Sequence, residues 1–79
     1  MRVHVKLFAT LSRFSPGGLP GTPFEAEVPE GATLRDLADQ LKIPLEETRI
    51  TFVNGIIQPM DWALHPGDQV GIFPPIGGG

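Results

Sequence analysis

The side chains that usually carry out catalysis are sparse in this sequence. It contains no cysteine, so no thiolate can act as a nucleophile or as a soft-metal ligand. Its two histidines, His4 and His65, stand far apart, and neither has another histidine or a cysteine nearby at metal-ligand spacing. The sequence also lacks the GxxxxGKS/T phosphate-binding motif and a nucleophile paired with a base. We therefore expect a chain that binds no cofactor or metal and is not itself an enzyme.

The remaining group that could take part in chemistry is the carboxylate of Gly79, at the end of the segment FPPIGGG. Gly77, Gly78 and Gly79 have no Cβ, so they could pass through a narrow channel and bring the carboxylate close to a reagent. A carboxylate is ionised at neutral pH and is a poor acyl electrophile. We expect a partner enzyme to activate it, for example as a mixed anhydride with AMP.

The residues before the glycines suit a stem that holds them away from the domain. Pro74 and Pro75 favour the extended polyproline conformation. Six residue steps from Phe73 to Gly79 reach roughly 20 Å, enough to enter the active-site channel of another protein. We expect contacts to that partner from the tail and from one more aromatic residue: Phe8, Phe73, Pro74, Pro75, Ile76, Gly77 and Gly78. The alternative is that the glycine run is a harmless, disordered end.

Length, composition and charge limit the classes of function. A chain of 79 residues is one domain, and 41% apolar residues fit a globular protein. No apolar run is long enough to span a membrane, so we expect a cytoplasmic protein. A net charge of -3 disfavours nucleic acid and favours a basic protein surface as the partner.

Two segments near the beginning alternate between apolar and polar residues, as half-buried strands do. Residues 3–8 (VHVKLF) place every second residue from Val3 on one face, and residues 24–28 (FEAEV) would form an antiparallel partner. Residues 15–23 are rich in glycine and proline and predict a loop, in which Leu19 could point inward.

Helical spacing of apolar residues is found in residues 33–44 (TLRDLADQLKIP). Thr33 and Asp36 form a variant of the capping box, and Pro44 marks a point by which the helix must have ended. The residues expected to face the core are Leu34, Leu37, Ala38 and Leu41.

Three further strands follow the helix. Residues 49–53 (RITFV) form the first, and Asn54-Gly55 is the dipeptide that type I′ hairpin turns prefer before the short strand at 56–59 (IIQP). Residues 69–73 form the last strand, and Asp68 before it is expected to form a turn.

This order of elements predicts an α+β fold of the β-grasp, ubiquitin-like type. We expect a mixed sheet of four to five strands with one main helix packed across it and with the last strand parallel to the first in the middle. Residues 1–73 would form this domain, and residues 74–79 a flexible tail.

In such a fold Phe8 and Phe73 lie together at the ends of neighbouring strands, on the face opposite the core. A pair of aromatic residues beside an extended segment suits an anchor for a partner. Alternatively, the loop over residues 9–23 covers both rings as a small additional core. Lys6 and Arg49 could contact an acidic partner or nothing.

Nearly the whole chain resembles the MoaD/ThiS family of ubiquitin-like sulfur carriers. The segments that carry the resemblance are ATLRDLADQL, VNG, PGDQVGIFPP and the terminal Gly-Gly. The resemblance implies that a ubiquitin-activating-type adenylyltransferase uses ATP to adenylate the carboxylate of Gly79. A thiocarboxylate would then form at Gly79 and donate its sulfur to a biosynthetic acceptor.

The motifs point to two acceptors. IFPPIGGG is similar to the tail of the small subunit of molybdopterin synthase, which inserts into the large subunit. NGIIQPMDW, with Trp62, is more similar to the carrier that serves thiazole synthase in thiamin biosynthesis. We favour molybdopterin, because the tail is the part that meets the partner directly, whereas Trp62 and Met60 are expected to pack against one end of the core. A carrier for tungsten-cofactor or amino-acid biosynthesis, a ubiquitin-like modifier and an inert interaction module remain as alternatives.

Overall fold

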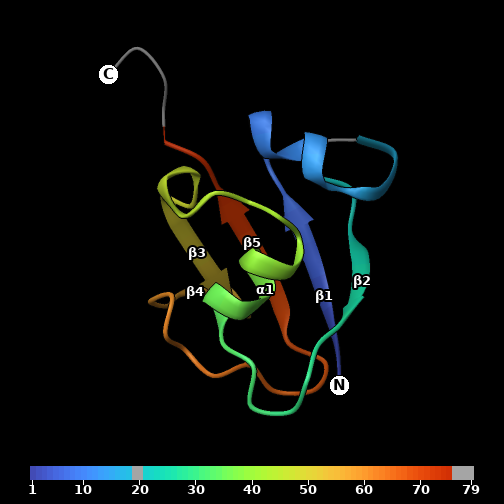
Figure 1. Ribbon diagram of the computed structural model, residues 1–79, viewed down its shortest axis with the longest axis vertical. Helices are drawn as coiled ribbons and strands as arrows, with labels where there is room; N and C mark the ends of the chain where they lie inside the picture. Colours follow the sequence, from blue (N-terminus) through green and yellow to red (C-terminus); the bar gives the residue numbers. More distant parts are fainter. Residues whose placement is uncertain (19–20, 76–79) are drawn as a thin grey trace.

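The computed structural model describes residues 1–18 and 21–75 (Figure 1). Leu19, whose inward position was considered above, and residues 76–79 of the tail lie outside the described residues. The strands are β1 (Arg2–Leu7), β2 (Phe24–Glu27), β3 (Ile50–Val53), β4 (Ile56–Ile57) and β5 (Gln69–Phe73). The helices are α1 (Leu34–Gln40) and the 3-10 helices η1 (Ala9–Phe14), η2 (Pro16–Gly18) and η3 (Leu45–Glu47). No helix within the described ranges is both long enough and apolar enough to cross a membrane.

The five strands form one mixed sheet in the order β2-β1-β5-β3-β4. β5 lies between β1, to which it is parallel, and β3, to which it is antiparallel. Figure 1 shows α1 lying across one face of this sheet. The β-grasp prediction, with the last strand parallel to the first in the middle of the sheet, is therefore confirmed.

The core fills the space between α1 and the covered face of the sheet. Val3, Val5 and Leu7 of β1 have no exposed surface, and neither do Leu34 and Leu37 of α1. The alternation in β1 and the spacing in α1 therefore identified the core-facing residues, because side-chain direction follows the local period of 2.0 or 3.6. Alternate residues of β1, β3 and β5 point to the other side of the sheet, which we call the open face.

Helix α1 begins and ends as its sequence predicts. The Thr33 hydroxyl accepts a hydrogen bond of 3.2 Å from the Asp36 amide, and the Asp36 carboxylate accepts one of 2.9 Å from the Thr33 amide. Leu41 is the C-cap and is only half-buried, because the helix ends before its last apolar position. Lys42 has a φ of 64°, which turns the chain before Pro44.

The segment between β1 and β2 differs from the predicted loop. It contains the 3-10 helices η1 and η2, and Leu11 of η1 is completely buried in the main core. A 3-10 helix repeats every three residues and is short, so the helical and strand periods used above do not detect it. Ala9, with a φ of 52°, makes the sharp turn from β1 into η1.

Two turns at the end of the sheet where β5 begins are joined by hydrogen bonds. Asn54 and Gly55 have φ angles of 53° and 83°, as a type I′ turn requires. The Asn54 side chain donates to the Asp68 carboxylate at 3.0 Å and accepts from the Gln69 amide at 3.0 Å. The same carboxylate accepts from the His65 amide at 2.8 Å, so Asp68 has the turn-forming role that was expected.

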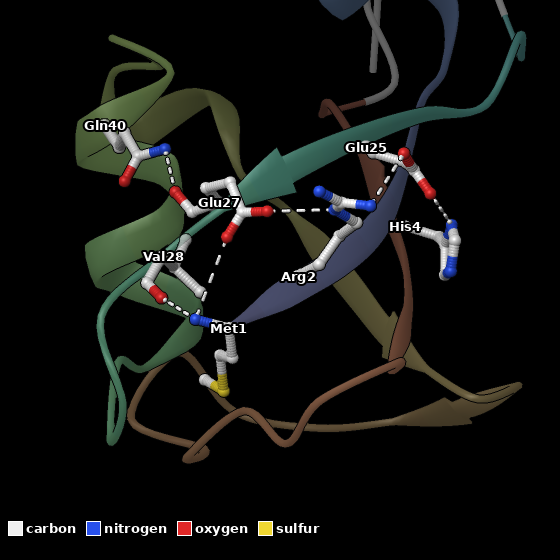
Figure 2. A network of polar contacts seen from close by, with 7 residues as sticks. All are labelled: Met1, Arg2, His4, Glu25, Glu27, Val28 and Gln40. Carbon is white, nitrogen blue, oxygen red and sulfur yellow. Dashed lines mark hydrogen bonds and ion pairs between the residues drawn. The ribbon is translucent and has the colours of Figure 1, made fainter.

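The β2 edge carries a network of polar contacts (Figure 2). Arg2 donates to Glu27 at 2.9 Å and lies 3.8 Å from Glu25. The hydrogen bond with Glu27, helped by the charges of both carboxylates, raises the pKa of Arg2. Gln40 of α1 reaches down and donates to the Glu27 carbonyl at 2.7 Å, so the helix covers one acceptor of this edge strand.

Candidate functional site

The candidate site lies where β5 leaves the sheet. Phe73 is the last residue of β5, and its carbonyl accepts a 2.9 Å hydrogen bond from the Arg49 amide, just before β3. Pro74 is half-buried and Pro75 is exposed. Figure 1 shows the short red segment after β5, up to residue 75, extending beyond the end of this strand. Neither proline has an N–H group, so neither can donate a further ladder bond to β3.

Three aromatic rings surround the start of this segment on the open face. Phe8 and Phe73 are stacked, with ring centroids 4.1 Å apart and ring planes at 2°. Phe52 of β3 packs edge-on against Phe73, with centroids 5.7 Å apart at 74°. Phe8 and Phe73 thus lie together as predicted, and we call Phe8, Phe52 and Phe73 the aromatic cluster.

Sequence reasoning did not identify Phe52 as part of this cluster. A signal was available, because Thr51 and Val53 are core residues of β3 and alternation then places Phe52 on the open face. Its position beside Phe73 also depends on the antiparallel register, in which Phe52 pairs with Gly71 and Ile50 pairs with Phe73.

Gly71 makes room for the stacked pair. A Cβ atom at this position would lie 3.4 Å from Cε2 of Phe8 and 4.0 Å from Cβ of Phe52. Glycine in the interior of a strand often marks a close approach by another group, which here is the ring of Phe8. The ring of Phe8 can therefore lie over the backbone of β5 and reach Phe73.

The aromatic cluster remains accessible between two depressions. One is lined by Lys6, Phe8, Phe52, Gly71 and Phe73 together with neighbouring residues. The other is lined by Arg49, Ile50, Phe52, Phe73, Pro74 and Pro75. All three rings are half-buried.

The described part of the loop between β1 and β2, residues 9–18 and 21–23, borders the cluster. It directs Leu11 into the main core. At Gly21 a Cβ would come no closer than 3.9 Å to the ring of Phe8. Within the described residues Phe8 and Phe73 are both half-buried and keep some exposed surface.

Trp62 and Met60 pack against the core, as expected. The Trp62 carbonyl accepts from the Leu34 amide at 3.0 Å, and the Met60 carbonyl accepts from the Arg35 amide at 2.9 Å. Packing beside the start of α1 therefore explains the position of Trp62. The Trp62 indole N–H is buried and has no hydrogen-bond partner among the described residues.

The described residues hold no group of three or more histidine, cysteine or acidic side chains that could bind a metal. His4 lies 3.8 Å from Glu25 on the open face, and His65 lies 3.7 Å from Asp68 in a turn. Phe8, Phe73, Pro74 and Pro75 are brought together at the candidate site, and Ile76, Gly77, Gly78 and Gly79 lie outside the described residues. The arrangement suits docking of another protein at the start of the tail.

Solved structures of ubiquitin-like β-grasp proteins are similar to this chain. SAMP1, the small archaeal modifier protein 1 of Haloferax volcanii, has 25% identity and a TM-score of 0.74, and the match covers 100% of both chains. A proposed molybdopterin converting factor subunit 1 from Pyrococcus furiosus has 32% identity and a TM-score of 0.71 over 95% of this chain and 98% of that chain.

A third structure is a complex of subunits 1 and 2 of the molybdopterin-converting factor from Helicobacter pylori. Its matching chain has 19% identity and a TM-score of 0.61, with 100% of both chains covered, and it supports the fold alone. No curated protein sequence matches this chain.

The family comparison covers the domain and the tail together. The model of the ThiS family matches residues 5–79, which is nearly the whole chain. The relative from Pyrococcus furiosus agrees with this match at 32% identity. The chain therefore belongs to the ThiS family of ubiquitin-like sulfur carriers and has their β-grasp fold.

Proposed function

We propose that this chain is a protein cosubstrate that carries sulfur on the carboxylate of Gly79 for molybdopterin biosynthesis. The main support for the proposal is that the match to the ThiS family extends to residue 79 and so includes the tail segment, residues 74–79. Phe73 is held in the sheet by stacking on Phe8 and by the Arg49 amide, and Pro74 and Pro75 lead away from it. Because Phe73 is fixed in the sheet and the two prolines restrict the chain after it, the glycines would be presented to a partner.

The chemistry requires two steps at the carboxyl group of Gly79. A carboxylate oxygen attacks the α-phosphorus of ATP, pyrophosphate leaves, and an acyl-adenylate forms. A sulfide equivalent then attacks the acyl carbon and AMP leaves, which gives the thiocarboxylate. Because the carboxylate is unreactive without activation, the first step belongs to a ubiquitin-activating-type adenylyltransferase, and ATP binds to that enzyme.

The second partner in this proposal is the large subunit of molybdopterin synthase. The relative at 32% identity is described as a molybdopterin converting factor subunit, which supports this acceptor. The structure of the Helicobacter pylori protein of the same fold is that of a complex with its subunit 2. We propose that the large subunit binds the aromatic cluster and receives the segment from Pro74 to Gly79.

Two alternatives have specific observations in their favour. The ThiS family match favours delivery of sulfur to thiazole synthase. The similarity to SAMP1, a protein named as a modifier, favours attachment of the Gly79 carboxylate to lysines of other proteins. Trp62, the main difference in sequence from the molybdopterin carriers, packs against the core, and we therefore assign it a structural role.

Deletion of Gly78 and Gly79 tests the carrier function directly. The truncated protein should keep its fold and lose ATP-dependent adenylation by the activating enzyme of the same organism. Circular dichroism is the control for the fold. Adenylation of the truncated protein at its new end would contradict the proposal.

The acceptor is tested with thiocarboxylated protein supplied separately to a molybdopterin-precursor system and to a thiazole-forming system. We expect product in the molybdopterin system. Product in the thiazole system alone would contradict our assignment and support delivery of sulfur to thiazole synthase. Intact-mass analysis of protein from cells tests the modifier alternative. A carrier gains only the mass difference between sulfur and oxygen, whereas a modifier appears as isopeptide-linked conjugates.

A further inference from the structure

The two depressions beside the aromatic cluster carry charge of one sign. The residues that line them include Lys6 on the β1 side of Phe73 and Arg49 on its β3 side. No aspartate or glutamate is among the described residues that line either depression. The chain as a whole has a net charge of -3, so the surroundings of the cluster differ in sign from the rest of the protein.

The acidic residues that share the open face lie at its edge and are already paired. Glu25 and Glu27 are on β2, and β1 separates them from the strand that carries Phe73. Figure 2 shows both carboxylates turned toward Arg2, which lies 3.8 Å from Glu25 and 2.9 Å from Glu27. Arg2 and the N-terminal ammonium of Met1, which lies 3.9 Å from Glu27, together balance the charge of these two carboxylates.

Lys6 and Arg49 differ from Arg2 in this respect. Within residues 1–18 and 21–75 neither forms an ion pair, and both side chains are exposed. A solvated cation costs nothing on a free surface. Once a partner covers the cluster, however, an unpaired cation at the border loses hydration, and the loss is compensated only if the partner supplies an anion.

The pairing of the strands places Lys6 and Arg49 on opposite sides of the aromatic cluster. Lys6 pairs with Gly71, and Gly71 pairs with Phe52, so β1 and β3 are two strand spacings apart, roughly 10 Å. The backbone of Arg49 is held beside Phe73 by the bond from its amide to the Phe73 carbonyl, and Arg49 lines the depression on the β3 side. A partner that covers Phe73 therefore meets one cation on each side.

We propose that the surface of the activating enzyme that docks on the open face has an apolar centre flanked by carboxylates, one for Lys6 and one for Arg49. This inference rests on the proposed function and adds the chemistry of the partner. It differs from the expectation of a basic partner, which followed from net charge alone. The charge that a partner meets is local, because exposed charges farther away than a Debye length of about 8 Å are largely screened.

Charge reversal with matched controls tests the inference. Lys6→Glu and Arg49→Glu are compared with Lys42→Glu and Arg35→Glu, which change the net charge equally. Lys42 and Arg35 are exposed, lie in or directly after α1, and also form no ion pair within the described ranges. The readout is kcat/KM for ATP-dependent adenylation by the purified activating enzyme of the same organism, with circular dichroism of every variant.

At low salt, kcat/KM should fall about fivefold for each of Lys6→Glu and Arg49→Glu, because an exposed attraction becomes a repulsion. The loss should shrink as salt is added. Lys42→Glu and Arg35→Glu should match the wild type. Equal effects of all four substitutions, or faster adenylation of Lys6→Glu and Arg49→Glu, would overturn the inference and leave the carrier function intact. A wild-type protein that is never adenylated would instead overturn the proposed function, and the inference with it.

Discussion

Phe8 and Phe73 stack with their ring centroids 4.1 Å apart, although they come from opposite ends of the sequence. The parallel pairing of β1 and β5 brings them together, and Gly71 leaves the space that the ring of Phe8 occupies. This contact joins the first strand to the residue from which the tail begins. It is therefore the point at which the fold can control the direction of the tail.

Phe8→Ala should weaken both the fold and the site. Loss of a half-buried ring that stacks on Phe73 should lower the free energy of unfolding by about 1–3 kcal/mol, less than for a fully buried phenylalanine. Adenylation should have a higher KM, because Phe73 loses its support. Urea denaturation and adenylation kinetics measure the two effects. Ile56→Ala, at a residue that is 62% exposed and outside the cluster, is the control and should change neither.

Gly71→Val should displace the ring of Phe8, because the first added carbon already lies 3.4 Å from that ring. Gly71→Ala requires a shift of only a few tenths of an ångström and should be nearly neutral in stability. The valine variant should lose about 1–3 kcal/mol through overpacking. Melting temperatures together with NMR shifts of the Phe8 and Phe73 ring protons distinguish the variants, and identical ring shifts in all three proteins would contradict the role of Gly71.

Asp68→Ala should destabilise the end of the sheet opposite the tail. The Asn54 side-chain amide and the His65 main-chain amide would each lose an acceptor, at a cost of about 1–3 kcal/mol. Asn54→Ala should also destabilise, since it places alanine at a φ of 53°. The double variant should cost less than the sum of the two, as measured by urea denaturation in a double-mutant cycle. Strict additivity would show that the two turns are not coupled.

Thr33→Ala removes the N-cap of α1 and should cost about 1 kcal/mol. The comparison is Thr22→Ala, because Thr22 is exposed and its side chain forms no hydrogen bond within residues 1–18 and 21–75. Chemical denaturation of the two variants is the measurement. Equal stabilities would mean that the capping box contributes nothing to the fold.

Alternation and helical spacing were sufficient to predict β1, α1 and the buried faces of both, because each pattern is set by neighbouring residues. The 3-10 helix at Ala9–Phe14 and the burial of Leu11 were missed, since a short 3-10 segment has no such pattern. The place of Phe52 in the aromatic cluster was missed for a different reason. Its partner Phe73 is fixed only by the register between β3 and β5.

The sequence by itself determined the order of the strands and of α1, the core-facing residues of β1 and α1, and the absence of cysteine chemistry, since all of these are local or compositional properties. Only the tertiary structure decided that Phe8, Phe52 and Phe73 form one accessible cluster flanked by Lys6 and Arg49. It also decided that Glu25 and Glu27 pair with Arg2 and the N-terminal ammonium. The physical reason is that these relationships join distant segments. Strand pairing fixes which side chains meet across a sheet, and burial and pairing decide which charges a partner encounters.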